Sequence, residues 1–115
     1  MNRPVVMQNG ADNEDIVVRD VVFENCIAEG VHFDCATLAH VIFRSCDMYW
    51  ASFFLAHLAD VTFDQCDLRG ADFKEATFVN VQFLDCDVGT DAIGGETQFD
   101  DTDLTGVKFE RCRGR

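Results

Sequence analysis

Residues 16–90 form an uninterrupted series of five-residue units: IVVRD VVFEN CIAEG VHFDC ATLAH VIFRS CDMYW ASFFL AHLAD VTFDQ CDLRG ADFKE ATFVN VQFLD CDVGT. The third position of every unit is apolar, and the first position is restricted to Ile, Val, Cys and Ala. Positions two, four and five are mostly polar or charged. The pattern therefore predicts that positions one and three of each unit point inward.

A period of five excludes an α-helix, because five steps of about 100° advance about 140° around the axis and spread the apolar positions over every face. In an extended segment, positions one and three share a face. Each unit is predicted to be a short strand followed by a bend at positions four and five. Because one unit cannot bury its apolar pair alone, the units are expected to wind into a coil whose turns stack.

The number of units in each turn follows from the motif V-x-F-x-x-C, which recurs at Val21, Val41, Val61 and Val81. This interval of 20 residues predicts a four-sided coil in which similar side chains stack. Side one stacks Phe23, Phe43, Phe63 and Phe83; side two stacks Ala28, Met48, Leu68 and Val88; side three stacks Phe33, Phe53 and Phe73; side four stacks Val18, Leu38, Leu58 and Phe78.

The register breaks at DAIGGE, which comprises Asp91, Ala92, Ile93, Gly94, Gly95 and Glu96, and then resumes as TQFDD TDLTG VKFER C. A six-residue loop at 91–96 would return Phe99 to side three and Phe109 to side one. In the alternative, DAIGG is a regular unit and Glu96 a one-residue bulge, which would shift VKFERC one side around. The sequence favours the loop, because the loop restores the repeat.

The units CDLRG ADFKE (66–75) resemble the A-[D/N]-L-x-x pattern of pentapeptide-repeat proteins, and the resemblance extends from Ile16 to Cys112 apart from the loop. It implies an all-β fold, a right-handed quadrilateral parallel β-helix of nearly five coils. Residues 1–15 are expected to be an N-terminal segment that caps one end, and residues 113–115 a basic tail. The resemblance also favours a homodimer. We expect end-to-end association through Phe109 and Cys112, where the last coil has no helix to cover it.

A length of 115 residues suits one domain, and 9 Lys and Arg against 21 Asp and Glu give a formal charge of −12. Such a chain is a poor direct binder of nucleic acid or anionic membrane and is better suited to a basic partner. No apolar run approaches the length of a membrane span. The N-terminal residues MNRPVVMQNGADNED lack the apolar core of a signal peptide, so the expected compartment is the cytoplasm.

Four cysteines, Cys26, Cys46, Cys66 and Cys86, occupy inward position one at intervals of 20. A soft-metal carrier is one interpretation of this ladder. We favour a structural one, because a buried free Cys behaves as a small hydrophobe and stacked thiols lack tetrahedral geometry. The sequence predicts no metal and no cofactor.

The histidines His32, His40 and His57 fall on different outward positions without a partnered nucleophile. A Gly-rich phosphate loop, HExxH and GxSxG are also missing from the sequence. The sequence therefore predicts no catalytic residues and a protein that is not an enzyme.

Two outward features are candidates for binding. Asp47, Asp67 and Asp87 form an acidic ladder, which is either a solvated row of charges or a surface for a cation or basic partner. Tyr49, Trp50, Phe54 and Leu55, here called the aromatic patch, occupy outward positions on sides two and three. Exposed aromatic residues are typical of interfaces. The alternative is that the N-terminal segment covers the patch within the same chain.

The first hypothesis for function is a non-enzymatic interaction scaffold that presents the aromatic patch and the loop at 91–96 to an unknown protein partner. The second comes from the resemblance, because some pentapeptide-repeat proteins are acidic dimers that mimic DNA, bind a type II topoisomerase (DNA gyrase) and modulate quinolone action. A soft-metal carrier that uses the Cys ladder is the third and weakest hypothesis.

Overall fold

The computed structural model describes residues 5–6, 15–90 and 93–114. All the regular structure within these ranges is β-strand, and they contain no helix. The strands are β1 (Val5–Val6), β2 (Val17–Glu24), β3 (Cys26–Ile27), β4 (Thr37–Arg44), β5 (His57–Asp64), β6 (Thr77–Val79), β7 (Gln82–Leu84) and β8 (Lys108–Glu110).

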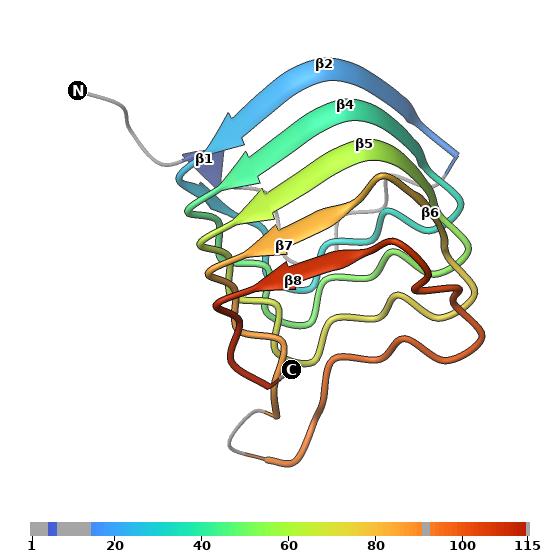
Figure 1. The fold of residues 1–115 in the computed structure, drawn as a ribbon. Helices are drawn as coiled ribbons and strands as arrows, with labels where there is room; N and C mark the ends of the chain where they lie inside the picture. Colours follow the sequence, from blue (N-terminus) through green and yellow to red (C-terminus); the bar gives the residue numbers. More distant parts are fainter. Residues whose placement is uncertain (1–4, 7–14, 91–92, 115) are drawn as a thin grey trace.

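The strands stack in parallel, one turn of the chain above the next (Figure 1). The main sheet has the order β2-β4-β5-β7-β8, with β6 also paired to β5. Phe43 pairs with Phe63, and Phe63 with Phe83, so one turn contains 20 residues as predicted. The predicted parallel β-solenoid is therefore confirmed. Its right-handedness and its count of nearly five coils stay predictions.

The last turn is longer than the others. Phe83 pairs with Phe109 and Asp72 with Gln98, and in both pairs the interval is 26 residues rather than 20. Six additional residues produce this register, whereas a one-residue bulge would have placed Phe109 on a different side. Thr90 and Glu96 form an antiparallel bridge that brings the two ends of the insertion together. Positions 91 and 92 of the predicted loop lie outside the described residues.

The fifth position of the unit turns the corner. Trp50 and Leu55 (both φ 60°) and Asn80 (φ 54°) have left-handed backbone angles there, like most described residues at this position. A left-handed conformation costs a non-glycine residue about 1–2 kcal/mol. Hydrogen bonds across the bend offset this cost, as when the Ala51 amide donates to the Met48 carbonyl (3.0 Å). The bend predicted at positions four and five is confirmed.

Two ladders of Phe rings fill the coil. On side one, the ring centroids of Phe63 and Phe83 are 5.0 Å apart with planes inclined by 5°. On side three, Phe53 and Phe73 stack at 4.9 Å and 4°. The two ladders meet edge to face, with Phe63 and Phe73 5.7 Å apart and inclined by 82°. Both contact geometries are favourable for aromatic rings, so each inward Phe is held by its own ladder and by the neighbouring one.

The ends of the solenoid extend slightly beyond the predicted bounds. At the N-terminal end, Val5 pairs in parallel with Cys26 and Val6 with Ile27, so β1 adds to the edge of the first coil. The other residues of the predicted cap, 1–4 and 7–14, lie outside the described residues. At the C-terminal end, Arg113 pairs with Asp87 and its amide donates to the Cys86 carbonyl (2.9 Å). Arg113 is therefore part of the coil rather than the start of a tail.

Replacing Phe63 with Ala tests the importance of the Phe ladders. Phe63 is fully buried and contacts rings above, below and beside it. We expect the variant to lose about 3–5 kcal/mol of unfolding free energy, measured by urea denaturation, because the deletion leaves a cavity. Phe54→Ala, the same change at an outward position, is the control and should lose much less. Equal losses in the two variants would contradict the assigned inward register.

Candidate interaction surface

The aromatic patch lies on an outer surface of the solenoid, as predicted, but its members differ in exposure. Trp50 is 44% exposed and Leu55 is 40% exposed, whereas Tyr49 and Phe54 are half-buried. The rings of Tyr49 and Trp50 meet edge to face with centroids 6.1 Å apart. Trp50 and Leu55 occupy the fifth, corner position of their units, which carries them furthest from the core. They are therefore the members most accessible to a partner.

A glycine one coil away holds the Trp50 indole in place. A Cβ atom added to Gly70 would lie 2.9 Å from Trp50 Nε1 and 3.0 Å from Cε2, so the indole lies directly against this glycine. Gly70 is buried and has a left-handed φ of 73°. Gly70 was not among the residues predicted from the sequence, although its position one turn after Trp50 was a usable signal. This contact fixes the tryptophan against the surface without hiding its outer face.

Arg69 organises the neighbouring tyrosine. Its guanidinium lies 5.5 Å from the centre of the Tyr49 ring, a cation–π distance. The guanidinium also donates to both carboxylate oxygens of Asp67, from Nε (2.9 Å) and Nη2 (2.8 Å), and its Nε lies 3.8 Å from Asp87. Partial burial opposes ionisation of Asp67, but the hydrogen bonds and charge of Arg69 lower the pKa of this carboxyl overall. Arg69 thus links the aromatic patch to the acidic ladder.

The acidic ladder has a structural role in addition to its charge. Asp47, Asp67 and Asp87 pair in register in successive coils. Each carboxylate accepts a hydrogen bond from the backbone amide two residues later, at 3.2, 3.1 and 3.0 Å respectively. This local bond stabilises the bend and explains why Asp suits position two. Arg69 contacts two of its three members, Asp67 and Asp87, within the same chain. Binding of a cation or a basic partner by the ladder stays a prediction.

Three thiols of the cysteine ladder form hydrogen bonds with the backbone. The thiols of Cys46, Cys66 and Cys86 donate to carbonyls of the preceding coil, with the Cys86 Sγ 3.1 Å from the Phe63 oxygen. Thr97 and Thr102 make the equivalent bond in the last coil, to the carbonyls of Leu68 and Phe73.

All six cysteines are free, and burial raises the pKa of the Cys26 thiol to about 11. Within the described ranges, no group of three or more His, Cys, Asp or Glu is arranged to hold a metal ion.

Two of the three histidines lie on the surface beside carboxylates, and the third, His57, is exposed. His40 Nε2 is 3.6 Å from Asp60, and His32 Nδ1 is 3.8 Å from Asp34. The Ser52 hydroxyl donates to Asp34 Oδ1 (2.5 Å), so its proton goes to a carboxylate rather than to an imidazole. This is not the nucleophile and base arrangement of a hydrolase.

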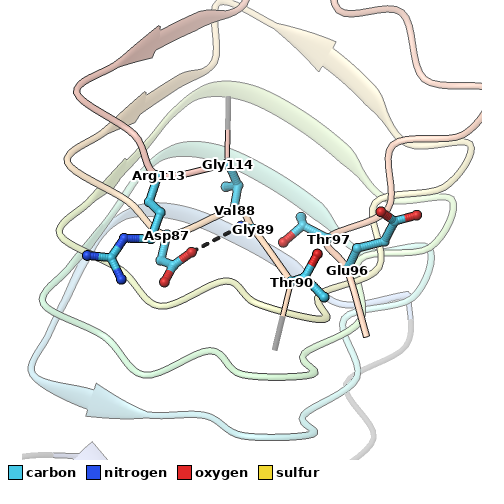
Figure 2. A pocket seen from close by; sticks show the side chains of 8 residues that line it. All are labelled: Asp87, Val88, Gly89, Thr90, Glu96, Thr97, Arg113 and Gly114. Atoms are coloured by element: carbon cyan, nitrogen blue, oxygen red, sulfur yellow. Dashed lines mark hydrogen bonds between the residues drawn. The ribbon is translucent and has the colours of Figure 1, made fainter. Parts of the chain in front are cut away.

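The ends of the insertion border a small hollow next to the last coil (Figure 2). Asp87, Gly89, Thr90, Glu96, Thr97 and Arg113 line it together with Val88 and Gly114. The Gly89 amide donates to Asp87 Oδ1 across one wall (Figure 2). Ile93, at 81% exposure, is the most exposed of the large apolar residues in the described ranges. The insertion therefore exposes one apolar side chain, and its two ends border a polar hollow.

The predicted end-association residues close the last coil. Phe109 stacks on Phe83 with centroids 4.9 Å apart, and the Cys112 thiol donates to the Phe83 carbonyl (3.1 Å). Both side chains are half-buried. They contribute to the core of their own chain, and their role in association stays a prediction.

The stacked strands and five-residue turns define a class of protein, the parallel β-solenoid built from five-residue units. The sequence family described as the pentapeptide repeat region matches residues 16–93 and 51–115. The chain therefore belongs to the pentapeptide-repeat family. No helix in the described residues is long and apolar enough to cross a membrane.

Solved structures share this fold. Trypsin-treated QnrB1, a plasmid-mediated fluoroquinolone resistance protein, aligns with a TM-score of 0.67 and 18% identity over 89% of this chain and 54% of that one. A pentapeptide repeat protein from the Arabidopsis thaliana thylakoid lumen aligns with a TM-score of 0.61 and 26% identity over 83% of this chain and 64% of that one. The chain thus spans about half of QnrB1 and less than two thirds of the Arabidopsis protein. No curated protein matches the sequence at a significant level.

Substituting Gly70 with Ala tests how the patch is organised. The new methyl group would overlap the indole of Trp50, the one tryptophan in the chain, so we expect its fluorescence to shift to the red as the ring moves into water. Gly106→Ala is the control, because Gly106 also has a left-handed φ (77°) but nothing within 4 Å of the added Cβ. Both variants should lose about 1 kcal/mol of stability. An unchanged emission spectrum for Gly70→Ala would contradict the contact.

Proposed function

We propose that this chain is a non-enzymatic scaffold for protein interaction, and that the aromatic patch is its binding surface. The observation that carries the proposal is the ordered exposure of Trp50, which lies against Gly70 next to a Tyr49 ring held by Arg69. A large aromatic side chain that is already fixed loses little conformational freedom on binding. Tryptophan and tyrosine are also the residues most often found at interaction hot spots.

The chemistry around the patch favours a basic partner with an apolar anchor. Glu29, Asp47 and Asp67 line a shallow depression together with Tyr49 and Arg69. The chain as a whole has a formal charge of −12, so a basic segment would be attracted to it from a distance. Trp50 and Leu55 would supply the apolar contact. All six cysteines are free, which supports a reducing compartment such as the cytoplasm for this interaction.

Comparative capture of partners tests the scaffold proposal. Wild-type protein and two variants, Trp50→Asp and Val79→Asp, would be used as bait in a lysate of the cells that produce the protein. Val79 is 59% exposed on side four, so its replacement adds the same charge away from the patch. We expect specific partners to be retained by wild type and Val79→Asp and lost by Trp50→Asp. Retention by all three baits would overturn the assignment of the patch.

The second candidate function is binding to a type II topoisomerase as an acidic mimic of DNA. The similarity in fold to QnrB1 and the charge of −12 favour it. Two observations weaken it: the chain spans 54% of QnrB1, and Arg69 and Arg113 interrupt the acidic surface beside Asp67 and Asp87. The mimic therefore ranks below the aromatic patch as an explanation.

A DNA gyrase supercoiling assay, with and without a fluoroquinolone, tests this second candidate. If the chain is a mimic, micromolar protein should inhibit supercoiling or relieve inhibition by the drug. Reversing the ladder's charge with Asp47→Lys/Asp87→Lys should abolish either effect, because the surface would no longer resemble a row of phosphates. No change with the wild-type protein would exclude the mimic for that enzyme.

A further inference from the structure

Cys112 extends the cysteine ladder into the last coil. It follows Cys86 by 26 residues, the same interval as between the paired residues Phe83 and Phe109. The four earlier members of the ladder are each 2% exposed, whereas Cys112 is half-buried. Two stacked thiols therefore lie at the C-terminal end of the core, and one of them reaches the surface.

The thiols repeat at the spacing of the coils. From Cys46 to Cys112, each sulfur atom lies 3.1–3.5 Å from two carbonyl oxygens, one of the residue two positions earlier and one of a Phe in the preceding coil. The Cys66 thiol is also within hydrogen-bonding reach of the thiols of Cys46 and Cys86. Because every coil repeats these contacts, neighbouring sulfur atoms are displaced by the distance between neighbouring strands, about 4.8 Å.

This spacing decides which chemistry two neighbouring thiols can share. A disulfide requires sulfur atoms about 2.05 Å apart, so at least one thiol would have to leave its carbonyl contacts. A bond between a thiolate and a metal ion is about 2.3 Å long, so one ion midway between two thiolates holds them about 4.6 Å apart. Cu(I), a soft ion with a filled d shell, prefers sulfur ligands and accepts two of them in a line. The spacing therefore fits a linear Cu(I) site better than a disulfide.

A surface depression reaches the ladder at its C-terminal end. Its lining residues are Asp85, Cys86, Asp87, Arg111 and Arg113. Arg111 and Arg113 also flank Cys112 along the chain, and cationic side chains favour the thiolate form of cysteine, which is the metal ligand. At the other end, Cys26 pairs with Val5 of β1, which adds to the edge of that coil. The depression therefore gives an ion a route to Cys86 and Cys112 from solvent.

We propose that Cys86 and Cys112 form a binding site for one Cu(I) ion, held in a line between their two sulfur atoms. On binding, two S–H bonds break and two Cu–S bonds form, both protons pass to water, and copper keeps its oxidation state. The sequence predicted no metal because stacked thiols do not provide tetrahedral geometry, and a linear site does not require it. The site lies in the last two coils, outside the aromatic patch, so it is independent of the proposed function.

Titration with a Cu(I)–bicinchoninate complex, under argon and without added thiols, tests the proposal, because the absorbance of the chelate measures the transfer of copper to the protein. We expect wild type to take up one Cu(I) per chain. Cys86→Ser and Cys112→Ser should bind it at least about 100-fold more weakly, since loss of an outer-shell partner alone costs 10–100-fold. The serine hydroxyl can keep the bond to the carbonyl, as the hydroxyls of Thr97 and Thr102 do.

The matched controls are two other cysteines. Cys35→Ser removes a thiol outside the ladder, and Cys26→Ser removes the member of the ladder that pairs with β1. Both controls should bind copper like wild type. Wild type that takes no copper from the chelate, or a Cys112→Ser variant that binds as tightly as wild type, would overturn the proposal. Loss of binding in Cys35→Ser would assign the copper to that thiol and overturn it as well.

Two measurements on wild type keep the test decisive if the serine variants do not fold. Cu(I) should protect Cys112 from alkylation by iodoacetamide and leave Cys35 reactive. X-ray absorption of the copper-loaded protein should show two sulfur neighbours around the ion. A third sulfur neighbour, or a Cys112 that is alkylated equally with and without copper, would overturn the linear site.

Discussion

The structure depends on the stacking of like side chains at intervals of one turn. The inward Phe rings pack face to face along each ladder and edge to face between ladders, and this is possible only if every turn contains the same number of residues. Aromatic pairs of this kind contribute about 0.5–1.5 kcal/mol each beyond the burial of their area. A change in register would break every such pair above it. The register is therefore the most strongly constrained property of the chain.

The same constraint explains why many polar side chains form hydrogen bonds with the backbone. Thiols at position one donate to carbonyls of the preceding coil, and Thr97 and Thr102 do the same where threonine takes the place of alanine in the coil before. Aspartates at position two accept amide hydrogen bonds at the bend. The cysteines and aspartates that the sequence offers as candidate ligands for a metal or cation therefore also support the backbone. The proposed binding surface instead uses outward side chains, above all Trp50 and Leu55, which are 44% and 40% exposed.

The sequence was sufficient to predict the coil, its four sides, the inward residues and the register after the insertion. These features depend on a periodic burial pattern, and a period can be counted from sequence. It was not sufficient to predict Arg69 and Gly70 as parts of the patch or the pairing of β1 with β3. The contacts of Arg69 and Gly70 with the patch depend on side-chain conformations, which a periodic burial pattern does not determine. The pairing of β1 depends on a segment outside the repeat. The half-buried state of Phe54 was missed for the first of these reasons.

The contacts of an outward side chain in this fold depend on the residue one turn away, because that residue is its nearest neighbour on the surface. Trp50 lies over Gly70, and Asn80 donates to Asp60. The six additional residues change this interval in the last coil. The Arg111 guanidinium consequently donates two hydrogen bonds to the carboxylate of Asp85, 26 residues earlier, from Nε (2.7 Å) and Nη2 (3.0 Å). An insertion in such a solenoid thus does more than add a loop, since it reassigns every surface pair between the two coils that it separates.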